Sequence, residues 1–378
     1  MDLNNFVIGA MRCGNFYMRG EILKTLALVM IVKNEEKHLA RCLQSVQHIV
    51  DDVIIVDTGS TDGTKDIACS FGANVFHFEW VNDFSAARNY ALMQSTCDWN
   101  LVLDADEYIV NDCKHIIRHF IETNERTIGR IKRIDEFVQN GEKRYAQSYL
   151  SRLLPKGVTY VGKIHEQVDS IFPRKNMDVE VYHDGYVYTN KTERNLQLLL
   201  EELSQHPTDD YVLYQVGKQY KLLMQFNVAE KYFEESYRLV PLEAWYRHSL
   251  VIDYLYTLIA NRSFEKGLQV IAQEQKRLHD SPDFHFVCGL FYMDAMFYNM
   301  ERYAYVFSFI EQSFIRCLEI GETDKYDRVR GTGSFLAAYN LGVFYEVTGQ
   351  MGKAIRFYEQ SAHEGYEKAS ERLKVLKQ

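Results

Sequence analysis

The feature that most constrains the fold is an alternation of short apolar runs with helical patterns over the first hundred residues. Leu26–Val32 is a continuous apolar run with β-branched residues, which is typical of a strand buried in a parallel sheet. Further runs lie at 53–56, 75–78 and 99–103, and Asn34 is expected to cap the helix after the first run. Repeated strand–helix–strand units predict a mainly parallel, Rossmann-like α/β sheet with helices on both faces.

A different pattern dominates the second half of the chain, where strand signals vanish and helical periodicity takes over. Starting from Gly217 and again from Gly342, a Tyr follows after 3 residues, an Ala after 12 and an aromatic residue after 16. This spacing resembles the tetratricopeptide repeat, a helix–turn–helix of 34 residues. Gly289, followed by Tyr292, is a degenerate third copy. The 125 residues between the two matched glycines are not a multiple of 34, so the middle is expected to hold insertions or irregular helices.

These patterns predict two domains after a short N-terminal extension. The extension covers residues 1–23, the α/β domain 24–190 and the all-α helical-repeat domain 191–378. From about 127 to 189 short alternating segments replace the helices, which indicates antiparallel additions to the sheet. A length of 378 residues agrees with more than one domain.

Composition and charge exclude several classes of function. The net charge is −9 with no run of Lys and Arg, so nothing favours nucleic-acid binding. The longest early apolar run is far too short to span a bilayer, and no basic leader precedes it, so we expect a cytoplasmic protein without integral membrane association. Seven scattered cysteines without a C-x-x-C pair argue against disulfides or zinc and favour small buried side chains.

Three polar clusters follow predicted strands, at the edge where open parallel sheets bind ligands. They are 33–36, 57–60 and 104–107. Asp104 and Asp106 flank one residue, so in an extended segment both carboxylates can face one ion. Oxygen ligands of this kind suit Mg²⁺ or Mn²⁺ held together with a substrate diphosphate. A solvated acidic turn is the ordinary alternative.

Other nucleotide-binding enzymes fit less well. The chain lacks a Gly-x-x-x-x-Gly-Lys-Ser/Thr phosphate loop and a Gly-x-Gly-x-x-Gly after the first strand, which disfavours an ATPase and a dinucleotide dehydrogenase. A nucleotidyltransferase would normally carry a Gly-rich basic loop there, and this chain has Lys-Asn-Glu-Glu at 33–36.

Four motifs, in this order and spacing, resemble the family 2 glycosyltransferases of the GT-A fold. They are Met30–Glu35 (MIVKNE), Ile54–Thr64 (IIVDTGSTDGT), Ala87–Asn89 (ARN) and Leu103–Glu107 (LDADE). The resemblance covers roughly residues 24 to 190. Together with the tetratricopeptide-like tail, it is similar to a bacterial subgroup that includes the peptide S-glycosyltransferases of glycocin bacteriocins.

The resemblance implies a nucleotide-sugar donor, a UDP-sugar with UDP-glucose the first choice. Asp57 would accept a hydrogen bond from the uracil ring, while Ile31 and Lys33 would line the base through their backbone. Arg88 would contact the uridine or the diphosphate, although a lone Arg is more often a surface salt-bridge residue. Asp104 would hold the ribose.

The resemblance also implies a metal and a base. Asp106 would bind Mg²⁺ or Mn²⁺ in the Asp104–Asp106 motif, and His183 would complete the metal site, where an ordinary hydrogen-bonded histidine is the alternative. Glu166, after the glycine loop that starts at Gly162, would be the catalytic base. The motif reads His-Glu rather than the common Glu-Asp, and His165 would orient Glu166 or touch a sugar.

The sequence therefore predicts an inverting, metal-dependent transfer of a hexose to a peptide side chain, with Cys preferred over Ser. A free thiol, with a pKa near 8.5, is partly thiolate at neutral pH. A surface polysaccharide or other glycan remains an alternative acceptor, and a catalytically dead scaffold an alternative function. We also predict a homodimer through the helical domain, with the aromatic-rich stretch 284–297 as a candidate contact surface. A monomer that buries this stretch internally is the alternative.

Overall fold

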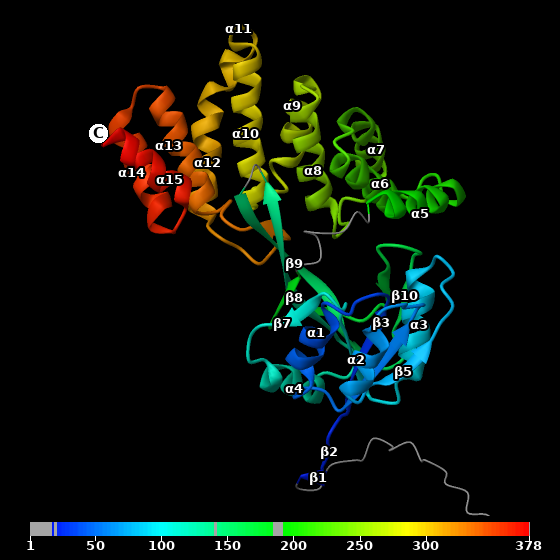
Figure 1. The fold of residues 1–378 in the computed structure, drawn as a ribbon. Helices are drawn as coiled ribbons and strands as arrows, with labels where there is room; N and C mark the ends of the chain where they lie inside the picture. Colours follow the sequence, from blue (N-terminus) through cyan, green and yellow to red (C-terminus); the bar gives the residue numbers. More distant parts are fainter. Residues whose placement is uncertain (1–16, 19–20, 140–141, 184–191, 378) are drawn as a thin grey trace, which may run out of the picture. The chain divides into compact units, whose positions relative to one another are not determined.

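The structure is a computed structural model that describes residues 17–18, 21–139, 142–183 and 192–377. The chain divides into two compact units, one of residues 1–136 and 149–188 and one of 137–148 and 189–378. Figure 1 draws both as ribbons coloured along the sequence. The second unit includes 137–148, a segment that the sequence analysis placed in the α/β domain.

The first unit contains a mixed sheet whose parallel half matches the predicted strands. Its strands are β3 (Leu26–Val32), β4 (Asp52–Asp57), β5 (Asn74–His77) and β6 (Trp99–Val102), in the spatial order β5-β4-β3-β6. All neighbours in this half are parallel, which confirms the α/β prediction.

Four more strands extend the sheet beyond β6 in the order β9-β8-β12-β7. They are β7 (Glu107–Ile109), β8 (Ile128–Gln139), β9 (Glu142–Pro155) and β12 (Arg174–His183). The β6–β9 and β12–β7 pairs are antiparallel, whereas β12 runs parallel to β8. Two separate two-stranded antiparallel sheets lie outside this one. One pairs β1 (Tyr17–Met18) with β2 (Glu21–Ile22), and the other pairs β10 (Thr159–Val161) with β11 (Gln167–Asp169).

Helices cover both faces of this sheet because its central strands are apolar on both sides. Leu28 and Met30 of β3 belong to one buried cluster with Leu43 of α1, and the alternate residue Val29 belongs to another with Ala91 of α3. The helices are α1 (Leu39–Val46), α2 (Thr64–Ser70), α3 (Phe84–Gln94) and α4 (Lys114–Thr123).

Asn34 does not cap α1, contrary to the sequence prediction. The helix begins at Leu39 with His38 at the N-cap position. Asn34 has a φ of 56°, and its Oδ1 accepts a hydrogen bond from Thr61 N at 2.8 Å. The side chain therefore joins the loops after β3 and β4 instead of starting a helix.

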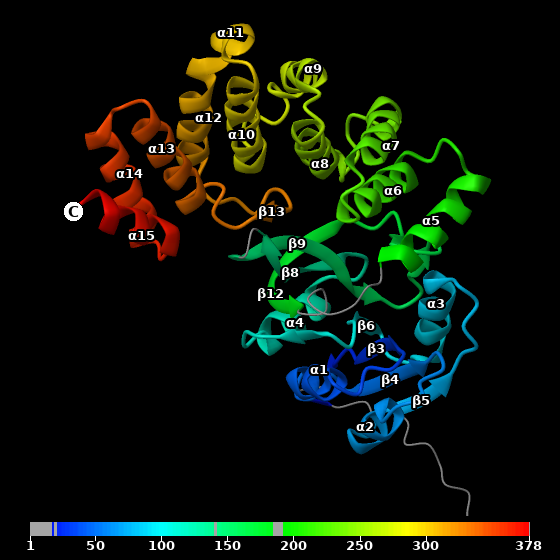
Figure 2. The same ribbon diagram turned by 45° about the horizontal axis from the view of Figure 1, so that its top comes forward.

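The second unit is built from successive helix pairs, which Figure 2 shows from a second direction. Its helices are α5 (Thr192–Gln205), α6 (Asp210–Leu222), α7 (Phe226–Leu239), α8 (Arg247–Ala260), α9 (Phe264–Glu274), α10 (Pro282–Tyr298), α11 (Met300–Tyr303), η2 (Ala304–Val306), α12 (Phe307–Ile320), α13 (Phe335–Val347), α14 (Met351–His363) and α15 (Glu367–Leu376). The tetratricopeptide-like prediction is confirmed.

The spacing of the repeats corresponds to close contacts between small and aromatic side chains. A Cβ added to Gly217 would lie 2.7 Å from the Phe233 ring, and one on Gly342 would lie 2.6 Å from the Tyr358 ring. Gly289 packs in the same way on Phe314, which follows it after 25 residues rather than 16. The insertion of α11 and η2 between α10 and α12 explains why this third copy is degenerate.

A short strand fixes residues 142–148 within the second unit. In β13 (Arg328–Val329), Arg328 pairs with Gln147 and Val329 with Ala146 in antiparallel register. The buried Asp283 carboxylate accepts hydrogen bonds from Val329 N at 2.8 Å and from Thr332 Oγ1 at 3.1 Å. These contacts, which are remote in sequence, explain why the segment groups with the helices.

The aromatic-rich stretch 284–297 is mostly core, so its proposed role as a contact surface was wrong for most of its side chains. Phe284, Phe286 and Phe291 are buried, whereas Phe297 is 69% exposed. Among the cysteines of the described residues, Cys69 is exposed and the rest are buried free thiols, which agrees with the prediction for those five.

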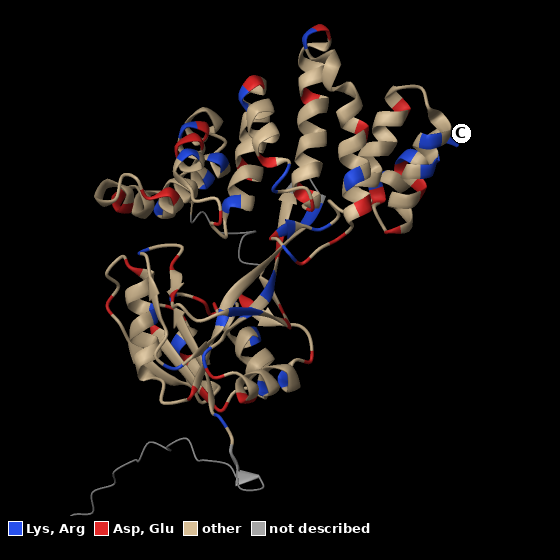
Figure 3. Ribbon diagram, turned by 180° about the vertical axis from the view of Figure 1, so that it is seen from behind, with Lys and Arg blue, Asp and Glu red and all other residues tan. Residues whose placement is uncertain are grey.

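Among the described residues, no helix is long and apolar enough to cross a membrane. Figure 3 shows acidic and basic positions interspersed along the elements of each unit.

Candidate active site

The loops that follow β3 and β4 lie at the carboxyl edge of the sheet, where the hydrogen bond between Asn34 and Thr61 joins them. Asp57, the last residue of β4, is 2% exposed, and its carboxylate accepts hydrogen bonds from Gly59 N at 3.2 Å and Ser60 N at 3.1 Å. Ile31 is half-buried on β3, and Lys33 is exposed just beyond it. The three residues predicted to surround a base therefore lie at the ends of neighbouring strands.

Asp104 lies between two buried arginines directly after β6. Its Oδ1 accepts a hydrogen bond from Arg88 Nη2 on α3 at 2.7 Å, and its Oδ2 accepts one from Arg152 Nη2 on β9 at 2.8 Å. Burial alone would raise the pKa of Asp104, but Arg152 and Arg88 hold it well below its usual range. Both carboxylate oxygens are thus engaged by guanidinium groups.

Glu107 holds the acidic loop in place through two contacts. It is 1% exposed, its Oε1 accepts from Arg152 Nη2 at 2.7 Å and its Oε2 accepts from Asp104 N at 3.0 Å. Burial raises the pKa of Glu107, against the opposing effect of Arg152. One Arg152 nitrogen therefore joins two carboxylates and sets the position of Asp104.

His183 lies between two carboxylates. Its Nδ1 is 2.7 Å from Asp135 Oδ1, and its Nε2 is 3.4 Å from Asp106 Oδ2. Burial alone would lower the pKa of His183, but the hydrogen bonds to Asp106 and Asp135 raise it to about 9. Arg133 Nε holds Asp135 at 3.1 Å. A carboxylate that orients the far nitrogen of a histidine is the arrangement found behind metal-bound imidazoles.

Glu166 reaches the same network from the loop between β10 and β11. Its Oε1 accepts a hydrogen bond from Arg88 Nε. The loop is anchored to the start of α3, because Phe84 N donates to Lys163 O at 2.8 Å. His165 adopts a left-handed φ of 51°, and its carbonyl accepts from Gln167 Nε2 at 2.8 Å.

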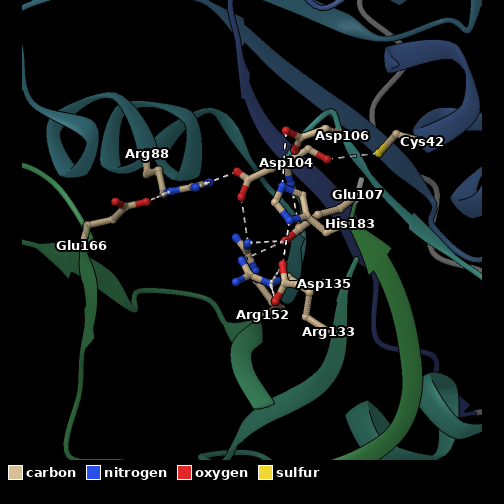
Figure 4. A network of polar contacts seen from close by, with 10 residues as sticks. All are labelled: Cys42, Arg88, Asp104, Asp106, Glu107, Arg133, Asp135, Arg152, Glu166 and His183. Atoms are coloured by element: carbon tan, nitrogen blue, oxygen red, sulfur yellow. Dashed lines mark hydrogen bonds and ion pairs between the residues drawn. The ribbon is translucent and has the colours of Figure 1, made fainter. Parts of the chain in front are cut away.

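Figure 4 shows these groups as one chain of contacts that runs from Glu166 to Asp106. Five carboxylates face three guanidinium groups. With His183 protonated, as its raised pKa implies near neutral pH, one negative charge is left over, and with His183 neutral, as a metal ligand must be, two are left over. A divalent cation would balance this charge. Among the described residues, no three His, Cys, Asp or Glu side chains converge on one metal position, since Asp104 is turned toward its arginines.

The residues present fit a metal with few protein ligands. Asp106 and His183 face each other, and Asp135 holds the histidine from behind. A hard cation that keeps substrate phosphate oxygens and waters needs only one or two carboxylates from the protein.

The structure brings together Arg88, Asp104, Asp106, Glu166 and His183, all of which the sequence analysis selected. It adds Glu107, Arg133, Asp135 and Arg152, to which the sequence analysis gave no role. A weak signal existed for two of them, because Arg133 and Asp135 alternate along a strand and so share one face. Arg152 is a single charged residue beside the apolar pair Leu153-Leu154. These neighbours predict that the arginine is buried, but they do not predict which residues it contacts.

Comparisons with known proteins cover parts of the chain. Residues 27–178 match the family model described as glycosyl transferase family 2. The chain is 34% identical over 216 residues to a TPR repeat-containing protein of Synechococcus elongatus, covering 52% of this chain and 53% of that protein. It is 29% identical over 234 residues to the SPbeta prophage-derived glycosyltransferase SunS of Bacillus subtilis, covering 56% of this chain and 53% of that protein.

The chain thus spans about half the length of the curated relatives it matches. Among solved structures, glucosyl-3-phosphoglycerate synthase from Mycobacterium tuberculosis, in complex with Mn²⁺ and UDP-glucose, aligns with a TM-score of 0.25 and 22% identity. That alignment covers 30% of this chain and 44% of the synthase chain.

Proposed function

We propose that the chain, whose residues 27–178 form a glycosyl transferase family 2 domain, moves a hexose from a UDP-sugar to a peptide side chain. The observation that carries this proposal is the continuous network that joins Glu166 to the Asp106–His183 pair. From Glu166 it runs through Arg88, Asp104, Arg152, Glu107, Arg133 and Asp135. In support, the residues assigned as base, donor contact and metal ligands belong to one network next to the carboxyl edge of the main sheet, the edge where ligands bind in open α/β folds.

The donor nucleotide is assigned to the loops after β3 and β4. Asp57 would accept from the uracil ring in addition to its own turn, and Ile31 and Lys33 would line the base through their backbone. Arg88 would meet the uridine or the diphosphate. Asp104 is assigned to the ribose rather than to the metal, because both of its oxygens already accept from guanidinium groups.

The metal, Mg²⁺ or Mn²⁺, is assigned to Asp106 and His183. Such an ion, when bound, neutralises the diphosphate leaving group as a Lewis acid. Asp135 keeps the His183 ring oriented by holding Nδ1, which leaves Nε2 facing Asp106.

Glu166 is assigned as the base that takes the acceptor proton during attack on the anomeric carbon. A single displacement of this kind inverts the configuration at that carbon. Positioned proton transfer typically contributes about 100- to 10,000-fold to a rate. His165, next to Glu166 in a left-handed conformation, is assigned to the orientation of this loop or to a sugar contact.

The acceptor is assigned as a peptide because the second unit is a stack of helical repeats, and extended concave surfaces of such stacks serve as binding surfaces. Cys is favoured over Ser, since a thiol ionises far more readily than a hydroxyl. A homodimer through the helical unit remains part of the proposal. Its contact surface would then include Phe297, Tyr298, Met300 and Tyr305, whose side chains are 69%, 54%, 67% and 61% exposed.

The test is donor turnover by the purified chain with a panel of labelled nucleotide sugars, in the presence of Mn²⁺ and in an EDTA control. We expect UDP to be released from one UDP-sugar in the presence of Mn²⁺, and we expect no release in EDTA. No turnover of any donor would favour a scaffold without catalysis. Transfer to oligosaccharides but never to peptides would overturn the peptide acceptor and retain the glycosyltransferase assignment.

A further inference from the structure

The segment 78–83, between β5 and α3, joins two parts of the candidate active site. Its first residue, Phe78, donates its backbone N–H to Asp57 O at 3.0 Å, beside the position assigned to the uracil ring. Directly after the segment, at the first residue of α3, Phe84 N donates to Lys163 O at 2.8 Å. The segment therefore runs from the donor side of the site to the loop that carries the proposed base.

Polar groups of this segment are engaged by the chain itself. The Trp80 indole N–H donates to Asn82 Oδ1 at 2.9 Å, and Asn82 has a left-handed φ of 59°. The Asp83 side chain caps α3, because its Oδ1 accepts from Ala86 N at 2.9 Å and from Ser85 Oγ at 2.8 Å. The only polar atom of the indole therefore has a partner before any ligand binds.

An apolar surface remains at the end of the segment that adjoins Lys163. The Trp80 ring stands edge-on to the Phe84 ring, with 4.8 Å between their centroids. Both side chains of this aromatic pair are half-buried, and Val81 is 57% exposed. Aromatic and apolar side chains make up most of the lining of ligand sites, so a half-exposed tryptophan at this place is suited to an apolar ligand group.

One helix, α3, carries a ring of the aromatic pair and also holds the loop of Glu166. Its Asn89 side chain exchanges two hydrogen bonds with the Tyr160 backbone, both at 2.8 Å. Its Arg88 Nε donates to Glu166 Oε1. Because these contacts and the backbone contact of Phe84 join the loop to the helix, the aromatic pair has a defined position relative to the proposed base.

We propose that Trp80, Val81 and Phe84 form a subsite for an apolar or aromatic side chain of the peptide acceptor, close in sequence to the residue that receives the sugar. This inference rests on the proposed function, because it takes Glu166 as the base that the acceptor must reach. Contact with such a side chain removes apolar area of both partners from water. A glycan would bring hydroxyl groups that need hydrogen-bond partners, whereas the indole N–H is already engaged.

The test compares two peptides with one Cys each, which differ only in the residues that flank it: Leu and Phe in the apolar peptide, Ser and Gly in the polar peptide. Initial rates of hexose transfer from the UDP-sugar with Mn²⁺ give KM and kcat. Trp80→Ala should raise the KM of the apolar peptide about tenfold or more, as truncation of an aromatic anchor typically does. It should leave the KM of the polar peptide within about twofold, and Trp80→Phe should restore most of the affinity for the apolar peptide.

Met93→Ala is the matched control, because Met93 is 73% exposed on α3 and lies outside the segment. Both KM values should stay at the wild-type level in this variant, and thermal melts should show that every variant folds. UDP affinity, measured by calorimetry, should be within about twofold of wild type in Trp80→Ala. A tenfold loss of UDP affinity would place Trp80 in the donor site and overturn the inference. Equal effects on the two peptides, or no effect on either, would also overturn it.

Calorimetric titration of the apolar peptide in the presence of UDP and Mn²⁺ separates this inference from the proposed function. The wild type should bind the peptide, and Trp80→Ala should bind it about tenfold more weakly. If the wild type turns over no donor, the proposed function fails, and this difference in binding still supports the subsite. If the wild type transfers hexose but Trp80→Ala binds the peptide equally well, the proposed function stands and the inference fails. No binding of the apolar peptide by the wild type likewise overturns the inference.

Discussion

The two units of the chain are specified in different ways. In the helical unit, the contacts that set the repeat join residues close in sequence, such as Gly217 with Phe233 and Gly342 with Tyr358. In the α/β unit, the contacts that set the site join distant residues: 78 positions separate Arg88 from Glu166, and 48 separate Asp135 from His183. Local steric complementarity leaves a regular spacing in a sequence, whereas a charge network of remote partners does not.

The comparison predicts that substitutions in the network change chemistry more than stability, and that substitutions at the repeat glycines do the reverse.

Asp106→Asn should abolish divalent-dependent donor turnover while the protein stays folded. The change removes the carboxylate of the Asp106–His183 pair but preserves the shape of the side chain. UDP release with and without EDTA measures the effect, and Asp112→Asn, an exposed neighbour on the same unit, is the control. Wild-type turnover in Asp106→Asn would remove the metal assignment.

Asp135→Asn should weaken Mn²⁺ binding by about 10- to 100-fold, the usual cost of losing an outer-shell carboxylate behind a metal-bound histidine. The residue touches His183 Nδ1 and Arg133, not the metal position itself. Mn²⁺ titration monitored by electron paramagnetic resonance gives the affinity. Asp178→Asn, exposed on the same strand as His183, should change nothing. Equal affinity in the two variants would argue against an orienting role for Asp135.

Mn²⁺ affinity should rise about tenfold per pH unit between pH 7 and about 9 and then level off. Metal ligands must be deprotonated, and the pKa of His183 is raised to about 9, so below that pH a proton competes with the ion. In the metal-free protein the free energy of unfolding depends on pH with the opposite sign. The stabilisation by protonated His183 is complete below the unfolded-state pKa of about 6.5. It is lost as pH rises toward about 9. His183→Gln should flatten the Mn²⁺ profile, and a profile that is already flat in the wild type would contradict the ligand assignment.

Gly342→Ala should lower the free energy of unfolding of the helical unit by about 1–3 kcal/mol through overpacking. The new Cβ would lie 2.6 Å from the Tyr358 ring. Gly352→Ala is the matched control, because its Cβ would meet nothing within 4 Å on α14, and alanine should add about 0.5–1 kcal/mol there. Chemical denaturation measures both. A stabilised Gly342→Ala, or a change in its Mn²⁺ affinity, would show that the two units are not separable in this way.

Sequence patterns predicted the parallel strands and the helical repeats, and they selected several motif residues that the structure brings into one network. They did not predict a role for Arg152, because a single arginine beside two leucines does not indicate that its partners are Asp104 and Glu107, which are remote in sequence. They misassigned Asn34, which has a positive φ and accepts a hydrogen bond from Thr61 N instead of capping α1. They gave no sign that 137–148 would group with the helical unit by contacts, since β13 is only two residues long and its pairing with β9 is nonlocal.

The most direct test of the account is mass spectrometry of a peptide after incubation with the purified chain, UDP-glucose and Mn²⁺. A peptide with one Cys and a matched Ser peptide are compared for the wild type and Glu166→Gln. The account predicts a hexose adduct on the Cys peptide that survives alkaline β-elimination and blocks thiol alkylation. It also predicts that Glu166→Gln damages transfer to the Ser peptide more than to the Cys peptide, because the thiol depends less on a base. Unmodified peptides alongside hexose transfer to oligosaccharides would contradict it.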